Sequence, residues 1–174
     1  MKSSPAHIDI IFIDLMDVQA SFTYDVFLNF RGADTRFGFT GFLYKALSDR
    51  GIRTFIDDEE LQRGFGVTPS IWKAIEESRI FIIIFSTNYA FSSFCLDELT
   101  LILGRYMENG RVVLPVFYHV DPSVIRHGTG SYGDALATHE ERFMKDSEER
   151  LERWRTSLNK AANLSGYHFS GYIC

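Results

Sequence analysis

The chain alternates between short apolar runs and longer stretches in which apolar residues recur every three or four positions. The short runs are rich in β-branched and aromatic residues, which favours strands, whereas the longer stretches predict amphipathic helices. We predict strands over residues 26–30, 53–56, 80–86, 112–117 and 167–169. We predict helices over residues 39–50, 68–78, 96–109 and 148–164.

Residues 80–85 are continuously apolar, which is typical of a central strand that is covered on both faces. Strands that alternate with helices predict a parallel sheet with right-handed crossovers. The expected fold class is therefore α/β: a flavodoxin-like three-layer fold with about five parallel strands and helices on both faces. Ligands of such sheets bind beyond the carboxyl ends of the strands. We expect the loops after Phe30, Asp58 and Ser86 to surround the site.

The loop after the first predicted strand combines a glycine with two arginines just before a helix. Gly32 allows the backbone to turn, and Asp34 or Thr35 could cap the helix that follows. Free N–H groups at a helix start, together with guanidinium groups, favour phosphate. An ordinary basic turn, in which Arg31 or Arg36 pairs with Asp34, fits the same residues. The residues alone leave both interpretations open.

A second candidate is Glu98, which we expect in the first turn of a helix that follows the loop 87–94. Acidic residues are common at helix starts because they complement the helix dipole, so the residue type alone does not establish a function. Cys95 is expected to be a small buried apolar residue rather than a nucleophile. The two cysteines and five scattered histidines have no metal-ligand spacing, so we predict no metal site.

With 174 residues and 45% hydrophobic residues, the chain is large enough for one domain with a real core. The net charge of −5 argues against general nucleic-acid binding, so a local cluster would have to hold any phosphate group. The apolar stretch 8–16 is too short to span a membrane. We expect a poorly ordered extension over residues 1–22, one domain over 23–168 and a tail over 169–174. The chain has no GxxxxGK loop, and we expect a stand-alone domain.

Five segments occur in an order that matches a known family. They are residues 24–36, 51–58, 73–78, 95–99 and 115–123. Together they resemble the plant-type TIR (Toll/interleukin-1 receptor) domain, as in TIR-only or truncated TIR-type disease-resistance proteins, from residue 24 to about residue 167. The resemblance implies the flavodoxin-like fold and cleavage of the nicotinamide–ribose bond of NAD⁺ or NADP⁺. The resemblance implies no cofactor, because NAD⁺ or NADP⁺ is the substrate.

The resemblance also implies a set of site residues. Glu98 occupies the position of the glutamate on which NAD-consuming TIR domains depend. One carboxylate is enough, because nicotinamide leaves without needing a proton and the carboxylate can stabilise the oxocarbenium-like transition state. Arg63 lies in the loop that gates the pocket in this family. The predicted substrate-binding residues are Asn29, Phe30, Arg31, Gly32, Ala33, Asp34, Arg36, Arg63, Ser92 and Phe94.

This chain differs from the family pattern at three places. Ala33 replaces a glutamate, Phe94 replaces a tryptophan, and Gly41-Phe42 replaces a polar-histidine pair on a helix that forms a dimer contact in the family. Phe42 would be exposed or turned into the core.

Two functions therefore compete. The first is an NAD(P)⁺ nucleosidase that self-association activates and that produces immune signalling nucleotides in the cytoplasm, with the nucleus as an alternative location. The second is a catalytically weak adaptor or decoy that acts through TIR–TIR interaction. The expected partners are further copies of the chain, or TIR domains of larger receptors, together with NAD(P)⁺; we expect no membrane span.

Overall fold

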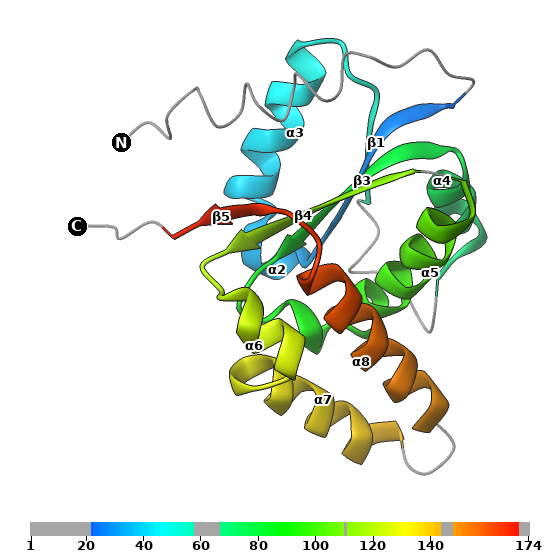
Figure 1. The fold of residues 1–174 in the computed structure, drawn as a ribbon. Helices are drawn as coiled ribbons and strands as arrows, with labels where there is room; N and C mark the ends of the chain where they lie inside the picture. The colour runs from blue at the N-terminus through cyan, green and yellow to red at the C-terminus, as the bar shows by residue number, and fades with distance from the viewer. Residues whose placement is uncertain (1–21, 58–66, 110, 144–147, 171–174) are drawn as a thin grey trace.

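A five-stranded parallel sheet forms the centre of the computed structural model, which describes residues 22–57, 67–109, 111–143 and 148–170 (Figure 1). The strand order is β2-β1-β3-β4-β5. The strands are β1 (Tyr24–Phe30), β2 (Thr54–Ile56), β3 (Ser78–Phe85), β4 (Val112–Tyr118) and β5 (Tyr167–Phe169). The predicted fold class is confirmed, and each predicted strand is present with ends that shift by two residues or fewer.

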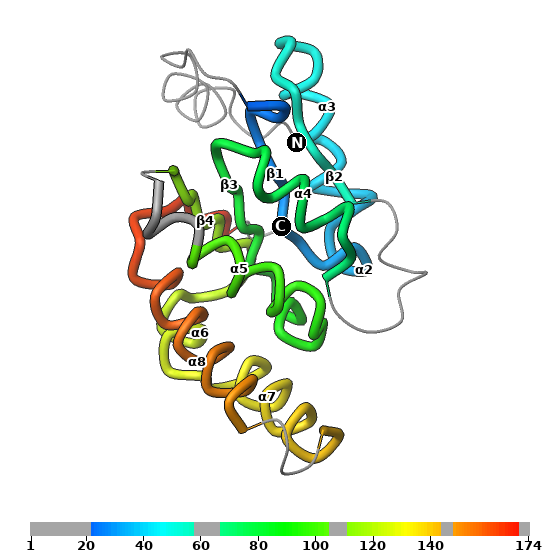
Figure 2. The backbone as a smooth tube through the Cα atoms, turned by 90° about the vertical axis from the view of Figure 1, so that its right-hand side faces the viewer, coloured from blue at the N-terminus to red at the C-terminus, as the bar shows by residue number. Residues whose placement is uncertain are grey.

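The helices cover both faces of the sheet (Figure 1). On one face α3 (Phe39–Asp49) packs its Leu43 and Leu47 against Val26, Leu28 and other residues of β1 and β3. On the opposite face lie α4 (Pro69–Glu76), α5 (Ser93–Asn109), α6 (Pro122–His127), α7 (Gly130–Phe143) and α8 (Glu148–Ala162). The helices α6, α7 and α8 form a group that extends beyond the sheet (Figure 2). Residues 80–85 are buried on both faces, as predicted for a central strand.

Two short elements occupy the carboxyl edge of the sheet. These are α2 (Gly32–Thr35), which follows β1 directly, and the 3₁₀ turn η1 (Tyr89–Phe91), which follows β3. The expectation that Asp34 or Thr35 caps the next helix is wrong, because both lie inside α2 and the N-cap of α3 is Gly38. The loop after β1 thus turns into a helix one residue after the strand ends.

Helix α5 begins three residues earlier than predicted. The Oγ of Ser92 accepts a hydrogen bond of 3.3 Å from the backbone N–H of Cys95, which is the usual contact of an N-cap residue. Glu98 therefore lies in the second turn of α5, and its predicted place in the first turn is wrong. The prediction that Cys95 is buried is confirmed, and its thiol donates to the carbonyl of Phe30.

The sequence analysis did not predict helices α6 and α7. The start of α6 carries a clear signal, because Asp121 caps the backbone N–H of Ser123 at 2.7 Å and Pro122 occupies the first helical position. Helix α7 was harder to predict, because its buried positions recur at helical spacing but one of them is a histidine, His139. That polar residue interrupts the apolar stripe from which an amphipathic helix is predicted.

His139 is buried in its neutral form, with 3% of its surface exposed. Its Nε2–H donates to the carbonyl of Ala90 at 2.9 Å, and the ring packs edge-on against Trp154. Its Nδ1 has no hydrogen-bond partner in the described part of the chain. Burial lowers the pKa of His139, and the positive charges of Arg142 and Arg150 lower it further.

The lowered pKa of His139 predicts a loss of stability in mild acid. The unfolded chain takes up this proton near pH 6.5, whereas the folded chain resists it. Well above pH 6.5 the residue is neutral in both states, so its titration does not affect the free energy of unfolding. The free energy of unfolding falls by up to about 1.4 kcal/mol per pH unit below that value. Urea unfolding at a series of pH values between 7.5 and 5.5 would measure this decrease in the free energy of unfolding. The decrease should be smaller in His139→Gln, because the glutamine does not take up a proton. Equal decreases in the two proteins would contradict this prediction.

Candidate active site

The Glu98 carboxylate is buried between α5 and β1, with 5% of the residue exposed. Its Oε2 accepts a hydrogen bond of 2.9 Å from the Nδ2 of Asn29, a fully buried residue of β1. Burying a carboxylate costs stability unless hydrogen bonds or charges compensate it. A polar pair at this depth in an otherwise apolar interior is therefore a candidate for function.

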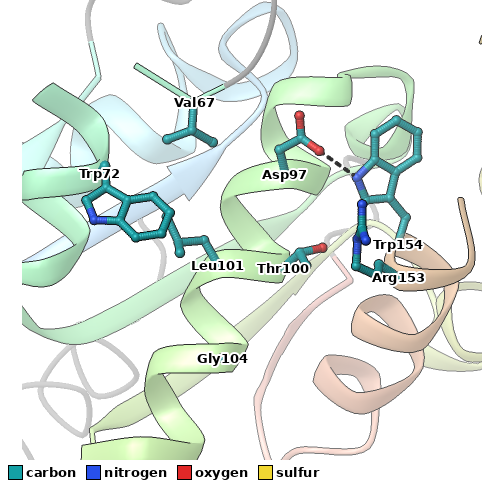
Figure 3. A pocket seen from close by; sticks show the side chains of 8 residues that line it. All are labelled: Val67, Trp72, Asp97, Thr100, Leu101, Gly104, Arg153 and Trp154. Atoms are coloured by element: carbon teal, nitrogen blue, oxygen red, sulfur yellow. Dashed lines mark hydrogen bonds between the residues drawn. The ribbon is translucent and has the colours of Figure 1, made fainter. Parts of the chain in front are cut away.

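The neighbouring carboxylate, Asp97, points in a different direction and has a structural role. It accepts a hydrogen bond from the Nε of Arg150 on α8 at 3.1 Å. It accepts another from the Nε1 of Trp154 on the same helix at 2.9 Å (Figure 3). It also lines an open groove of about 400 Å³ between α4, α5 and α8, together with Trp72 and Leu101. Of these two consecutive acidic residues, Asp97 joins α5 to α8, whereas Glu98 faces the sheet.

A small cavity adjoins Glu98. Its volume is about 10 Å³, which is close to the space of one water molecule. Glu98 and five further residues line it, namely Leu28, Phe30, Asp57, Phe94 and Cys95. A nicotinamide ring is much larger than this space, so the conformation described here is closed around the carboxylate.

A larger groove of about 500 Å³ opens next to this cavity. It is lined by Arg31, Gly32, Ala33, Arg36, Phe37, Phe91, Ser92, Ser93, Phe94 and Arg142. Phe94 is the one residue that lines both spaces in the described part of the chain, so its side chain is the candidate barrier between the open groove and Glu98. A ligand in the groove would reach the carboxylate once this side chain moved.

Both arginines after β1 have partners within the chain. Arg31 forms an ion pair of 2.5 Å with Asp34, the pairing that the sequence offered as an alternative to phosphate binding. Arg36 donates to the carbonyl of Asp57 at 2.7 Å, and its guanidinium lies 5.0 Å from the ring centre of Phe30. Both guanidinium groups nevertheless line the groove.

Asp34 ties the loops after β1 and β3 together. Besides its ion pair with Arg31, it accepts hydrogen bonds from the Oγ of Ser86 at 2.6 Å and from the backbone N–H of Asn88 at 3.1 Å. The two loops that form the walls of the groove are thus fixed to each other by one carboxylate.

Most of the predicted site residues meet at this edge. Arg31, Gly32, Ala33, Arg36, Ser92 and Phe94 line the groove, and Phe30 and Glu98 line the small cavity. Asn29 lies behind Glu98, and Asp34 joins the loops without lining either space. Arg63 lies outside the described residues.

Sequence reasoning missed four residues of the groove, namely Phe37, Phe91, Ser93 and Arg142. Phe37 is 98% exposed, and an aromatic residue directly after Arg36 in a short polar loop was the available signal. Arg142 could not be found, because it reaches the groove from α7 and that helix was not predicted. Phe42 on α3 was expected to be either exposed or turned into the core, and it is 75% exposed.

Within the described ranges, no three His, Cys, Asp or Glu side chains gather closely enough to hold a metal ion. None of the helices there has the length and apolar character that crossing a bilayer requires.

The chain is similar to known proteins over most of its length. The family model of the TIR domain matches residues 23–172. The disease resistance protein RPV1 of Vitis rotundifolia is 55% identical over 146 residues, which cover 84% of this chain and 10% of that protein. The TMV resistance protein N of Nicotiana glutinosa is 48% identical over 144 residues, which cover 83% of this chain and 12% of that protein. The chain thus spans about a tenth of the length of these relatives.

A solved structure matches as well. The TIR domains of the activated Roq1 resistosome, which directly recognises the pathogen effector XopQ, superpose with a TM-score of 0.78. They are 46% identical in sequence, and the match covers 84% of this chain and 87% of that chain. With a family model that matches most of its length, this chain belongs to the TIR domain family, and its relatives are plant disease-resistance proteins.

Proposed function

We propose that this TIR domain is an NAD(P)⁺ nucleosidase that self-association activates, and that its products act in plant defence signalling. The observation that carries the proposal is the buried Glu98 carboxylate, which Asn29 holds beside a groove lined by arginine and aromatic side chains.

The chemistry of the bond suits a single carboxylate. When the nicotinamide–ribose bond breaks, its electron pair moves to the ring nitrogen and neutralises the pyridinium charge, so no proton donor is needed. Positive charge develops on the ribose C1′ and its ring oxygen. The Glu98 carboxylate, placed near that ribose, would stabilise this charge more in the transition state than in the substrate. Water would then complete the hydrolysis at C1′.

The groove has the features that a dinucleotide requires. Arg31, Arg36 and Arg142 bring guanidinium groups to it, and these form charge-assisted hydrogen bonds with phosphate oxygens. Phe37 and Phe91 offer apolar ring surface on which a base can stack. Because the net charge of the chain is −5, this local cluster rather than the overall field would attract the diphosphate.

Self-association would act on the closed conformation. The cavity at Glu98 measures only about 10 Å³ and shares Phe94 with the groove, so Phe94 would have to move before a substrate in the groove reached the carboxylate. Contacts between copies that move Phe94 or the neighbouring loops would open that path. The similarity to TIR domains in an assembled resistosome supports assembly as the activating step.

A second candidate function is an adaptor that binds other TIR domains with little turnover. The observation that favours it is the exposure of two large aromatic side chains, Phe37 just before α3 and Phe42 on α3. Large apolar side chains that remain exposed can contribute to protein–protein contacts. The adaptor requires neither an open Glu98 cavity nor a dinucleotide in the groove.

The assignment of Glu98 predicts loss of activity in Glu98→Gln. Nicotinamide release from NAD⁺, measured with the protein concentrated on a multivalent support, should fall at least about 100-fold, because charge stabilisation of the transition state is lost. The matched control is Asp97→Asn, which alters the adjacent carboxylate and weakens its contacts with α8. That variant should unfold at a lower urea concentration and still release nicotinamide.

Equal rates for wild type and Glu98→Gln would contradict the role of Glu98. Absence of nicotinamide release from the wild type at every concentration, with TIR–TIR binding retained, would instead favour the adaptor.

The groove predicts a separate effect for Arg142→Ala. The exposed guanidinium of Arg142 would contact phosphate equally in the bound substrate and in the transition state, so its loss should raise KM and leave kcat unchanged. Loss of about 1 kcal/mol corresponds to roughly a five-fold rise in KM. Steady-state kinetics would measure it, with Arg153→Ala in the distant groove beside Trp154 as the control. Identical KM values for both variants would contradict phosphate binding by Arg142.

A further inference from the structure

We propose that Tyr89 is a positioning residue for Glu98, and that its hydroxyl fixes the orientation of the Asn29 side-chain amide that holds the carboxylate. The effect on the reaction rests on the proposed nucleosidase function. The hydrogen-bond arrangement can be tested without it.

Three buried side chains form a continuous series from the loop after β3 to α5. The Tyr89 hydroxyl donates to the Oδ1 of Asn29, and the Nδ2 of Asn29 donates to the Oε2 of Glu98 at 2.9 Å. The carbonyl of Cys95 lies 3.1 Å from the Tyr89 hydroxyl and 3.4 Å from the Asn29 Nδ2. Tyr89 and Asn29 are both fully buried, so water does not compete for these groups.

The donors and acceptors fit one arrangement. Asn29 turns its NH₂ group toward Glu98, whose Oε2 accepts the hydrogen bond. The Oδ1 of Asn29 then faces Tyr89, whose hydroxyl must donate. The second hydrogen of the amide points toward the carbonyl of Cys95. With the amide reversed, Oδ1 would oppose the oxygen of Glu98, and like partial charges would repel.

Tyr89 is suited to hold this arrangement. Burial raises the pKa of the Tyr89 phenol well above its ordinary value, and the nearby Glu98 charge raises it further, so the hydroxyl stays a neutral donor. Its ring packs edge-on against Phe85, with 4.9 Å between the ring centres. The preceding residue, Asn88, donates its backbone N–H to Asp34. The start of this short turn is therefore anchored both to β1, through Asn29, and to the loop that follows β1, through Asp34.

Removing the Tyr89 hydroxyl should change kcat rather than KM. Without it, the buried Oδ1 of Asn29 loses its donor, and the amide is free to rotate toward other partners. Glu98 would then be held less well in the orientation that faces the ribose, and small displacements of catalytic groups are costly in rate. Tyr89 does not line the groove, so substrate binding should be unaffected.

The test compares Tyr89→Phe with Tyr132→Phe. Tyr132 on α7 is also fully buried, and its hydroxyl donates to the carbonyl of Ser86 at 2.8 Å. Each variant removes one buried hydroxyl and keeps the ring, so a general loss of stability should be similar in both. Proton–nitrogen NMR spectra would show the side-chain NH₂ signals of Asn29, assigned by their absence in Asn29→Ser. Nicotinamide release would give kcat and KM.

We expect Tyr89→Phe to shift or broaden the Asn29 NH₂ signals and to lower kcat about ten-fold at unchanged KM. Tyr132→Phe should change neither. Unchanged Asn29 signals in Tyr89→Phe would overturn the proposal, as would shifted signals with the kcat of the wild type. If the wild type releases no nicotinamide, the nucleosidase function fails. Shifted Asn29 signals would then still support the orienting role of Tyr89, and unchanged signals would still refute it.

Discussion

The pairing of β1 with β3 is the constraint on which the candidate site depends. These strands pair in parallel from Tyr24 and Ser78 at one end to Phe30 and Ile84 at the other. The chain runs from β1 outward to β2 and then returns to β3 on the opposite side of β1, so the strand order reverses between them. The loops that follow β1 and β3 diverge at this point, which is where parallel sheets usually bind ligands.

Polar groups connect these two loops across an apolar interior. Asp34 accepts hydrogen bonds from the loop after β3, and Asn29 joins that loop to Glu98 through Tyr89. Buried polar networks are costly unless every member is satisfied, and satisfied ones hold a single geometry. Here the network holds the carboxylate in place from the side of the sheet. Phe94, which lines both the small cavity and the groove, is the side chain that we propose a substrate must displace.

Much of the fold could be predicted from local patterns, because the strands are short apolar runs and the central one, residues 80–85, is continuously apolar. The candidate site could be predicted only in part. Glu98 was found through a family resemblance, since an acidic residue near a helix start is ordinary by itself. Asn29 was expected to contact the substrate, and its place behind Glu98 depends on strand pairing that no local pattern reveals. Tyr89 and Arg142 were missed for the same reason: tertiary packing brings them to the site.

The most direct test of the account is a crystal structure of Glu98→Gln bound to NAD⁺, since this variant should bind the dinucleotide without cleaving it. We expect the nicotinamide ribose within hydrogen-bond distance of residue 98, the Phe94 ring displaced, and the diphosphate against Arg36 and Arg142. A dinucleotide bound elsewhere, such as in the groove beside Trp72 and Trp154, with Phe94 still closing the cavity, would contradict it.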